Sequence, residues 1–256
     1  MDGNSPEKWF KSLPILTRSL LVTLFATTCL VGMGLLDPHS IILDWGLVTR
    51  KYVVPESFQC ELCRYHLWRL ISSGLFLGGF SFGFVMQLYL FTNFSSKLEA
   101  NPRFAAVPGE YLYFLFVISF LVASFSLLLA WPRGYPLTGP SIIFAIIYYW
   151  SRCEPEAPLS IWGFQVKGYQ LPFALVFISL LMGGDIWKDI LGIVAGHLYH
   201  FLKDVVPIEY NVNVLKAPRI FSLAYKKITG EAAPPAAPAA PGGGMFVGGG
   251  YRLGGM

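Results

Sequence analysis

Residues 111–131 read YLYFLFVISFLVASFSLLLAW, a run of 21 residues without a charged side chain. A helix of about 20 apolar residues is long enough to cross the hydrocarbon core of a bilayer. The composition agrees, because 54% of the residues are hydrophobic and 13% are charged, whereas soluble domains carry about 25% charged residues. The sequence therefore predicts a protein that lies in a membrane.

Five further apolar stretches recur along the chain. The first, Ser19–Leu36, follows basic residues as a signal peptide does. It is longer than the roughly 7–15 apolar residues of a signal peptide and does not end at a small-residue cleavage site, so we interpret it as a retained span. The other four are Phe80–Phe94, Ser141–Trp150, Tyr169–Met182 and Asp189–Leu202. With residues 111–131 they predict an all-α membrane protein, a bundle of six transmembrane helices.

Several of these stretches are short for a span, and Ser141–Trp150 has only ten residues before Ser151 and Arg152. Two interpretations are open. The short helices lie inside the bundle, shielded by their neighbours, or the bilayer becomes thinner around them at a modest cost.

The distribution of lysine and arginine predicts the orientation, since cytoplasmic loops carry an excess of these residues. If the N-terminus is cytosolic, 13 of the 19 lie on the cytosolic side and six on the other. We therefore expect both termini in the cytosol and a long lumenal loop over residues 37–69. The net charge of +4 is small and scattered, so no nucleic-acid partner is expected.

Four segments follow from this organisation. They are residues 1–16, a cytosolic segment at the membrane surface; 17–205, the transmembrane domain; 206–230, a membrane-proximal cytosolic segment; and 231–256, a tail rich in Ala, Pro and Gly. Such a tail has little to bury, which predicts disorder.

Two pairs of residues stand at the ends of predicted spans. Trp68-Arg69 follows the long loop, and a Trp-Arg pair at an interface is most often an anchor. Gly192 and Gly196 form a G-x-x-x-G pattern, which is most often a surface for close helix packing. In this order and at these places, the four residues resemble the signature of the rhomboid fold.

Active rhomboids carry a serine in a Gly-x-Ser-Gly motif and a histidine three residues before the first glycine of the sixth span. Here Ser141 is present in Gly139-Pro140-Ser141-Ile142, but Asp189 stands at the histidine's place. A carboxylate with a pKa near 4 is a poor general base for a serine hydroxyl. His197 lies eight residues beyond Asp189, about 12 Å along a helix, and we expect it to pack in the core. We therefore predict no catalytic residues; the alternative is an active rhomboid-type serine protease that uses Ser141.

More specific stretches resemble the derlin family, the rhomboid-like pseudoproteases. They are Leu13–Arg18 (LPILTR), Leu88–Glu99 (LYLFTNFSSKLE), Glu110–Leu112 (EYL) and Gly196–Tyr199 (GHLY). This resemblance implies a non-catalytic protein of the endoplasmic reticulum membrane that helps move misfolded proteins to the cytosol for degradation. It also implies misfolded clients, a membrane E3 ubiquitin ligase complex and homo- or hetero-oligomers as partners, a client path between the second and fifth spans, and no cofactor.

The C-terminal tip contains Phe246, Gly248, Gly250, Leu253 and Gly254 at the spacing Phe-x-Gly-x-Gly-x-x-Leu-Gly. A glycine-rich tail is most often a flexible linker. The two apolar residues at this spacing, however, resemble the SHP box, which implies binding to the valosin-containing AAA ATPase.

Cys60, Cys63 and His66 lie close together in the predicted lumenal loop. Two cysteines and one histidine do not complete the four ligands of a structural zinc site. We predict no metal site, and a local disulfide and two free thiols both stay open.

Overall fold

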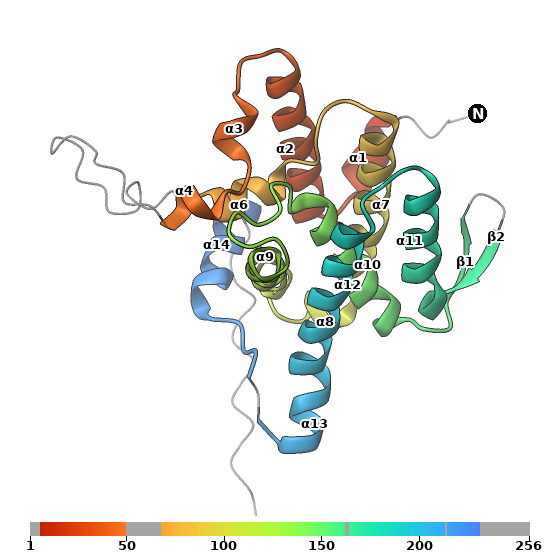
Figure 1. Ribbon diagram of the computed structural model, residues 1–256. Helices are drawn as coiled ribbons and strands as arrows, with labels where there is room; N and C mark the ends of the chain where they lie inside the picture. Colours follow the sequence, from red (N-terminus) through yellow and green to blue (C-terminus); the bar gives the residue numbers. More distant parts are fainter. Residues whose placement is uncertain (1–5, 50–67, 162–163, 213, 231–256) are drawn as a thin grey trace, which may run out of the picture.

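The structure is a computed structural model that describes residues 6–49, 68–161, 164–212 and 214–230, and it is mostly helical (Figure 1). The α-helices are α1 (Pro6–Ser12), α2 (Ile15–Gly32), α3 (Pro38–Ile41), α4 (Trp45–Thr49), α6 (Arg69–Ser72), α7 (Phe82–Glu99), α8 (Pro102–Ala105), α9 (Glu110–Leu129), α10 (Gly139–Cys153), α11 (Leu171–Leu181), α12 (Ile186–His200), α13 (Val206–Tyr210) and α14 (Arg219–Thr229). Short 3-10 turns cover Ser73–Leu75 and Gly168–Gln170, and a π-helical turn covers Phe201–Val205.

Each of the six predicted spans contains a helix, namely α2, α7, α9, α10, α11 and α12. Within the described part of the chain, α2 with 18 residues and α9 with 20 are both long and apolar enough to cross a membrane. The prediction of a mostly helical chain is thus confirmed, and the count of six spans stays a prediction.

Helix α10 is the central helix of the bundle. Every residue from Gly139 to Ser151 is buried, and α7, α9, α11 and α12 all pack against it (Figure 1). Its 15 residues give a length of about 22 Å, which is less than the roughly 30 Å of a hydrocarbon core. For this helix the structure agrees with burial among its neighbours, and a thinner bilayer stays a prediction.

Aromatic rings fill the core between α9, α10 and α12. The Phe114 ring lies edge-on to Tyr199 at 4.8 Å, and Tyr149 contacts both rings at 5.2 Å. Edge-to-face pairs of this kind add about 0.5–1.5 kcal/mol beyond the burial of their area. The cluster fixes how the three helices lie against one another.

The start of α2 is held by a carboxylate from another helix. Pro14 precedes α2 and provides no side-chain cap. Instead, the Glu99 carboxylate at the end of α7 accepts hydrogen bonds from the N–H groups of Leu16 (3.0 Å) and Thr17 (2.7 Å) and from the Thr17 hydroxyl. A negative charge at a helix N-terminus is favourable. Thr17 also contacts Ser95, which contacts the Tyr111 hydroxyl, so three of the derlin-like stretches meet in one hydrogen-bond network.

One feature departs from the sequence-based predictions. An antiparallel hairpin of β1 (Pro158–Ile161) and β2 (Phe164–Lys167) connects α10 to α11, whereas the sequence predicted only helices. Helix α12 continues through the π-helical turn into α13, to Tyr210 (Figure 1), and the boundary at residue 205 between the transmembrane domain and the membrane-proximal segment stays a prediction.

An ionic cluster ties the end of this long helix to the bundle. Asp204 accepts hydrogen bonds from Arg103 (3.0 Å) and His200 (2.8 Å), and Lys203 pairs with Glu110. Burial alone would raise the pKa of the Asp204 carboxyl, but the hydrogen bond from His200 and the charge of Arg103 outweigh it and hold this pKa below its ordinary value. The cluster links the π-helical turn to α8 and α9.

Candidate functional site

The two glycines of the G-x-x-x-G pattern lie where α12 and α10 approach most closely. A Cβ atom at Gly192 would lie 2.2 Å from the carbonyl oxygen of Ser141 and 2.7 Å from the Cβ of Phe144. A Cβ at Gly196 would lie 2.9 Å from the carbonyl oxygen of Ala145. Only glycine leaves room for the backbones to lie this close at Gly192.

This contact brings two of the rhomboid-like positions near one another. Ser141 is buried against Gly192, and Asp189 is buried one turn before Gly192 on α12. Asp189 keeps one carboxylate oxygen, Oδ2, without a hydrogen-bond partner. Ile142, which replaces the second glycine of the rhomboid motif, is buried, and its Cδ1 would lie 2.7 Å from a Cβ at Gly74.

The prediction that His197 packs in the core is wrong. Its side chain is exposed, and its Nδ1 shares a hydrogen bond of 2.7 Å with the Tyr148 hydroxyl. Gly192 and Gly196 lie on the face of α12 that packs on α10. His197 follows Gly196 directly and therefore points about 100° away from that face. Tyr148 lies seven residues after Ser141, about 10 Å along α10, so His197 is far from the serine.

Arg69 organises the segment that follows α2. Its guanidinium is buried and donates from Nη1 to the carbonyl oxygens of His39 (2.7 Å) and Ile42 (2.9 Å). Trp68 beside it is 43% exposed. Arg69 therefore joins the start of α6 to the backbone of residues 39–42, whereas Trp68 lies at the surface.

A hollow of about 460 Å³ opens between α7 and α11. Its apolar lining comes from Phe82, Met86, Tyr89, Leu90, Phe144, Leu175, Ile178 and Met182, and its polar lining from Ser81, Gln87, Ser179 and Asp189. Its volume falls in the range of about 300–1,000 Å³ that is usual for ligand sites. The hollow lies between the helices of the predicted second and fifth spans.

Two buried polar atoms in this hollow have no partner within the described residues, Oε1 of Gln87 and Oδ2 of Asp189. Polar groups at membrane depth are costly unless they are paired or face a water-filled cavity, and they mark functional sites. Met86 and Met182 provide flexible apolar side chains, which suit surfaces that bind varied partners. The hollow can thus receive an apolar segment, and the two oxygens belong to its lining residues but are themselves buried.

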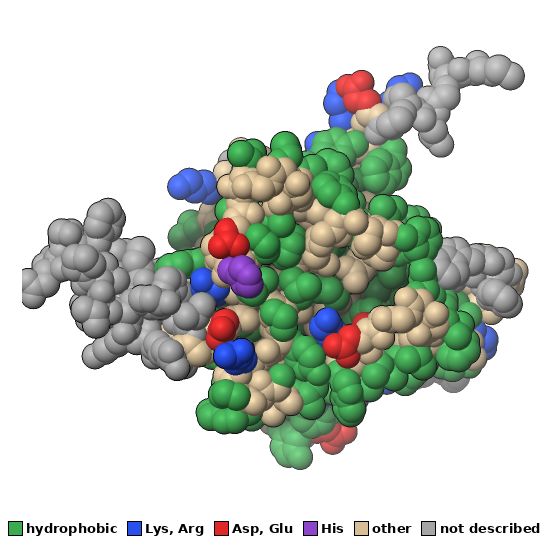
Figure 2. Space-filling view, turned by 45° about the horizontal axis from the view of Figure 1, so that its top comes forward, with side chains coloured by type: hydrophobic (Ala, Val, Ile, Leu, Met, Phe, Trp, Pro, Cys, Tyr) green, Lys and Arg blue, Asp and Glu red, His purple; other side chains and the backbone are tan. Residues whose placement is uncertain are grey.

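Figure 2 shows hydrophobic side chains over much of one face, with a few pairs of charged groups of opposite sign side by side among them. Lys188 and Asp185 form an ion pair of 3.5 Å beside Asp189. In the described part of the chain, no three His, Cys, Asp or Glu side chains are placed to hold a metal ion.

Comparison with known proteins shows to which family the chain belongs. The model of the Der1-like family matches residues 13–219. The chain belongs to the Der1-like family. It is 33% identical to Derlin-1 of Arabidopsis thaliana over 84% of this chain and 76% of that protein. It is 30% identical to Derlin-1.1 of Zea mays over 98% of this chain and 99% of that protein, and 31% identical to a probable derlin-2 homolog of Dictyostelium discoideum over 83% and 80%.

Membership in the Der1-like family agrees with the resemblance found in the sequence, and with the apolar helices it makes the chain a membrane protein. The sequence had identified Asp189, but not the other residues that line the hollow. Gln87 was detectable as a polar residue in an apolar stretch, whereas Met86 and Met182 carried no signal. The predicted tail residues Phe246, Gly248, Gly250, Leu253 and Gly254, with Cys60 and Cys63, lie outside the described residues.

Proposed function

We propose that this Der1-like protein is a non-catalytic component of endoplasmic-reticulum-associated degradation. It lies in the endoplasmic reticulum membrane with both termini in the cytosol. It recognises misfolded lumenal or membrane proteins and assists their passage to the cytosol, where the tail recruits the valosin-containing AAA ATPase.

The observation that carries this proposal is the hollow between α7 and α11. It combines a mostly apolar lining and two methionines with the unpartnered oxygens of Gln87 and Asp189. Such a surface accepts chains of varied sequence, because it relies on apolar contact and adaptable side chains rather than on a fixed set of hydrogen bonds. A misfolded client is a ligand of this kind.

Site-specific photo-crosslinking tests this step. A photoreactive phenylalanine analogue replaces Met86 or Met182 in the hollow, or Val22, which is 51% exposed on α2 and does not line the hollow. In microsomes that synthesise a truncated, unstable secretory reporter, we expect reporter adducts at Met86 and Met182 and few at Val22. Equal adduct yields at the three positions would remove the hollow from the client path.

The lack of catalysis is supported by the arrangement around Ser141. Asp189 stands where a general base is needed, and His197 faces outward to Tyr148. The alternative, a serine protease, predicts labelling of the purified protein by a fluorophosphonate probe that disappears in Ser141→Ala. We expect no labelling above that of the Ser141→Ala variant.

The proposed ATPase partner rests on the sequence of the tail. A synthetic peptide of residues 244–256 should bind the isolated N-domain of the ATPase with micromolar affinity in a fluorescence polarisation assay. Phe246→Ala together with Leu253→Ala should abolish binding, since burial of each apolar side chain contributes about 1.5–3 kcal/mol. Unchanged affinity would mean that the resemblance to the SHP box is accidental.

A membrane E3 ubiquitin ligase complex and further copies of a Der1-like chain complete the proposed partners. Affinity purification of the tagged protein in mild detergent tests them, with and without the last eleven residues. Loss of the ATPase alone from the truncated sample would assign the ligase and oligomer contacts to the membrane domain.

A further inference from the structure

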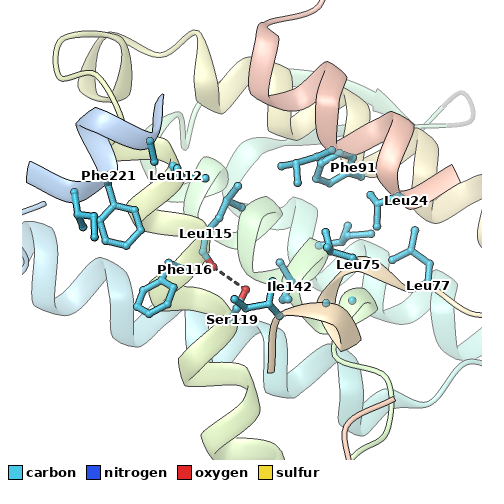
Figure 3. A pocket seen from close by; sticks show the side chains of 17 residues that line it. Leu24, Leu75, Leu77, Phe91, Leu112, Leu115, Phe116, Ser119, Ile142 and Phe221 are labelled. Atoms are coloured by element: carbon cyan, nitrogen blue, oxygen red, sulfur yellow. Dashed lines mark hydrogen bonds between the residues drawn. The ribbon is translucent and has the colours of Figure 1, made fainter. Parts of the chain in front are cut away.

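A second cavity, of about 370 Å³, lies between α2, α9 and α10, and it shares no lining residue with the hollow between α7 and α11. In Figure 3, Leu24, Leu75, Leu77 and Phe91 line one side of it, and Leu112, Phe116 and Phe221 line the other. The cavity lies against the residues of α10 that face away from α12, including Ile142 and Ile143.

The lining of this cavity is almost wholly apolar. Ser119 is the single described residue of the lining that carries a polar side chain. Its hydroxyl donates a hydrogen bond of 2.8 Å to the Leu115 carbonyl oxygen in its own helix (Figure 3). A ligand in this cavity therefore gains contacts for hydrocarbon and at most a hydrogen bond to the Ser119 oxygen, which disfavours sugars, nucleotides and extended peptides.

Helix α14 closes one end of the cavity. Ile220, Phe221 and Ala224 line it, and the Phe221 ring packs against Tyr113 at 5.2 Å and Phe116 at 5.4 Å. The contact with the bundle is close, because a Cβ at Gly109 would lie 2.4 Å from the Phe221 carbonyl oxygen. The cavity thus reaches from the interior of the bundle to α14.

Helix α14 carries only positive charge, which indicates what kind of group a ligand of this cavity would carry at that end. The helix contains Arg219, Lys226 and Lys227 and no acidic residue. Lys227 lies three residues after Ala224, on the neighbouring part of the same face, and its side chain is exposed. Amphipathic helices with basic residues beside an apolar face lie in the headgroup region, where they attract anionic lipids.

We propose that this cavity holds one acyl chain of an anionic phospholipid, whose phosphate group lies against Lys227 of α14. The volume is in the range of small-ligand sites, whereas a transmembrane helix is about 10–12 Å across with its side chains and needs a wider groove. An acyl chain needs no hydrogen bonds, and the lining offers almost none. The negative phosphate complements the positive charge of Lys227, which lies beside the cavity-lining face of α14, whereas Arg219 and Lys226 lie on the opposite face of that helix.

Lipid retention by the full-length protein tests the proposal. The protein is purified in mild detergent from membranes that contain phosphatidylserine and phosphatidylcholine, and bound lipid is measured by native mass spectrometry. We expect about one phosphatidylserine per chain to survive purification. Replacing Lys227 with Gln should weaken phosphatidylserine binding roughly fivefold, since one basic residue near an anionic surface contributes about this factor.

Two further variants separate the two ends of the ligand. Lys8→Gln with Lys11→Gln and Lys167→Gln removes three basic residues from α1 and β2, and phosphatidylserine binding should be unchanged. Ser119→Phe fills the cavity and should displace the bound lipid; if this variant does not fold, the two charge variants still decide the question.

Three results would overturn the proposal. The first is an equal loss of phosphatidylserine in the two charge variants. The second is that the unmodified protein retains phosphatidylcholine as well as phosphatidylserine. The third is that a photoreactive phenylalanine analogue at position 119 crosslinks to a protein instead of a lipid.

Discussion

Replacement of Gly192 with alanine tests the close contact between α10 and α12. The new Cβ would lie 2.2 Å from the Ser141 carbonyl oxygen and 2.7 Å from the Phe144 Cβ. The two backbones must therefore separate by roughly 1 Å before the methyl group reaches an ordinary contact distance near 3.5 Å.

The expected cost follows from two opposing effects. Overpacking of a well-packed interior costs about 1–3 kcal/mol, and separation of the helices puts Gly192→Ala at the upper end. The higher helix propensity of alanine returns about 1 kcal/mol. We expect a net loss of about 1–2 kcal/mol, or roughly 2–8 °C in the melting temperature of a domain of this size.

Two other glycines provide matched controls for the same chemical change. At Gly196 the nearest atom would lie 2.9 Å away, and at Gly83 on α7 it would lie 3.6 Å away. Gly196→Ala should therefore cost less than Gly192→Ala, and Gly83→Ala should be neutral or slightly stabilising.

The assay heats the purified variants in detergent and measures the monodisperse fraction by size-exclusion chromatography. Wild-type stability of Gly192→Ala would refute the reasoning, and so would an equal loss in Gly83→Ala, because in either case the distances would not determine the ranking.

Three further variants probe polar contacts. Glu99→Ala leaves two N–H groups of α2 without their acceptor, so SDS titration should show a loss of about 1–3 kcal/mol. Glu156→Ala, at an exposed position just before the hairpin, should show little change. Arg69→Lys should increase proteolysis of the segment that follows α2, because lysine cannot reproduce the geometry of the guanidinium; an unchanged digestion pattern would contradict that role. The folded-state pKa of Asp204 is lower than its unfolded value, so its stabilising effect is present above about pH 4 and is lost as the pH falls through the folded-state pKa. Asp204→Asn should therefore lower the melting temperature at pH 7, with a difference from wild type that shrinks below pH 4; a constant difference would show that ionisation of Asp204 is not its cause.

The sequence by itself located the helices of the six apolar stretches to within a few residues. It could do so because long apolar runs are a composition signal that does not depend on what each helix contacts. It also showed that Asp189 stands in place of a general base, since that conclusion needs only residue identity and spacing. The α9 run, for example, is apolar on all sides and predicts a helix whatever surrounds it.

Which faces of these helices meet was decided by the tertiary structure. A helix that is apolar all round carries little periodic signal about its buried side, so the central position of α10, the outward direction of His197 and the two cavities were not readable from residue patterns. Glu99 and Thr17 are 82 residues apart in the chain, and each is ordinary in its own segment. Packing of α2 against α7 makes the carboxylate a helix cap, because the free N–H groups of α2 and the negative charge become neighbours only in three dimensions.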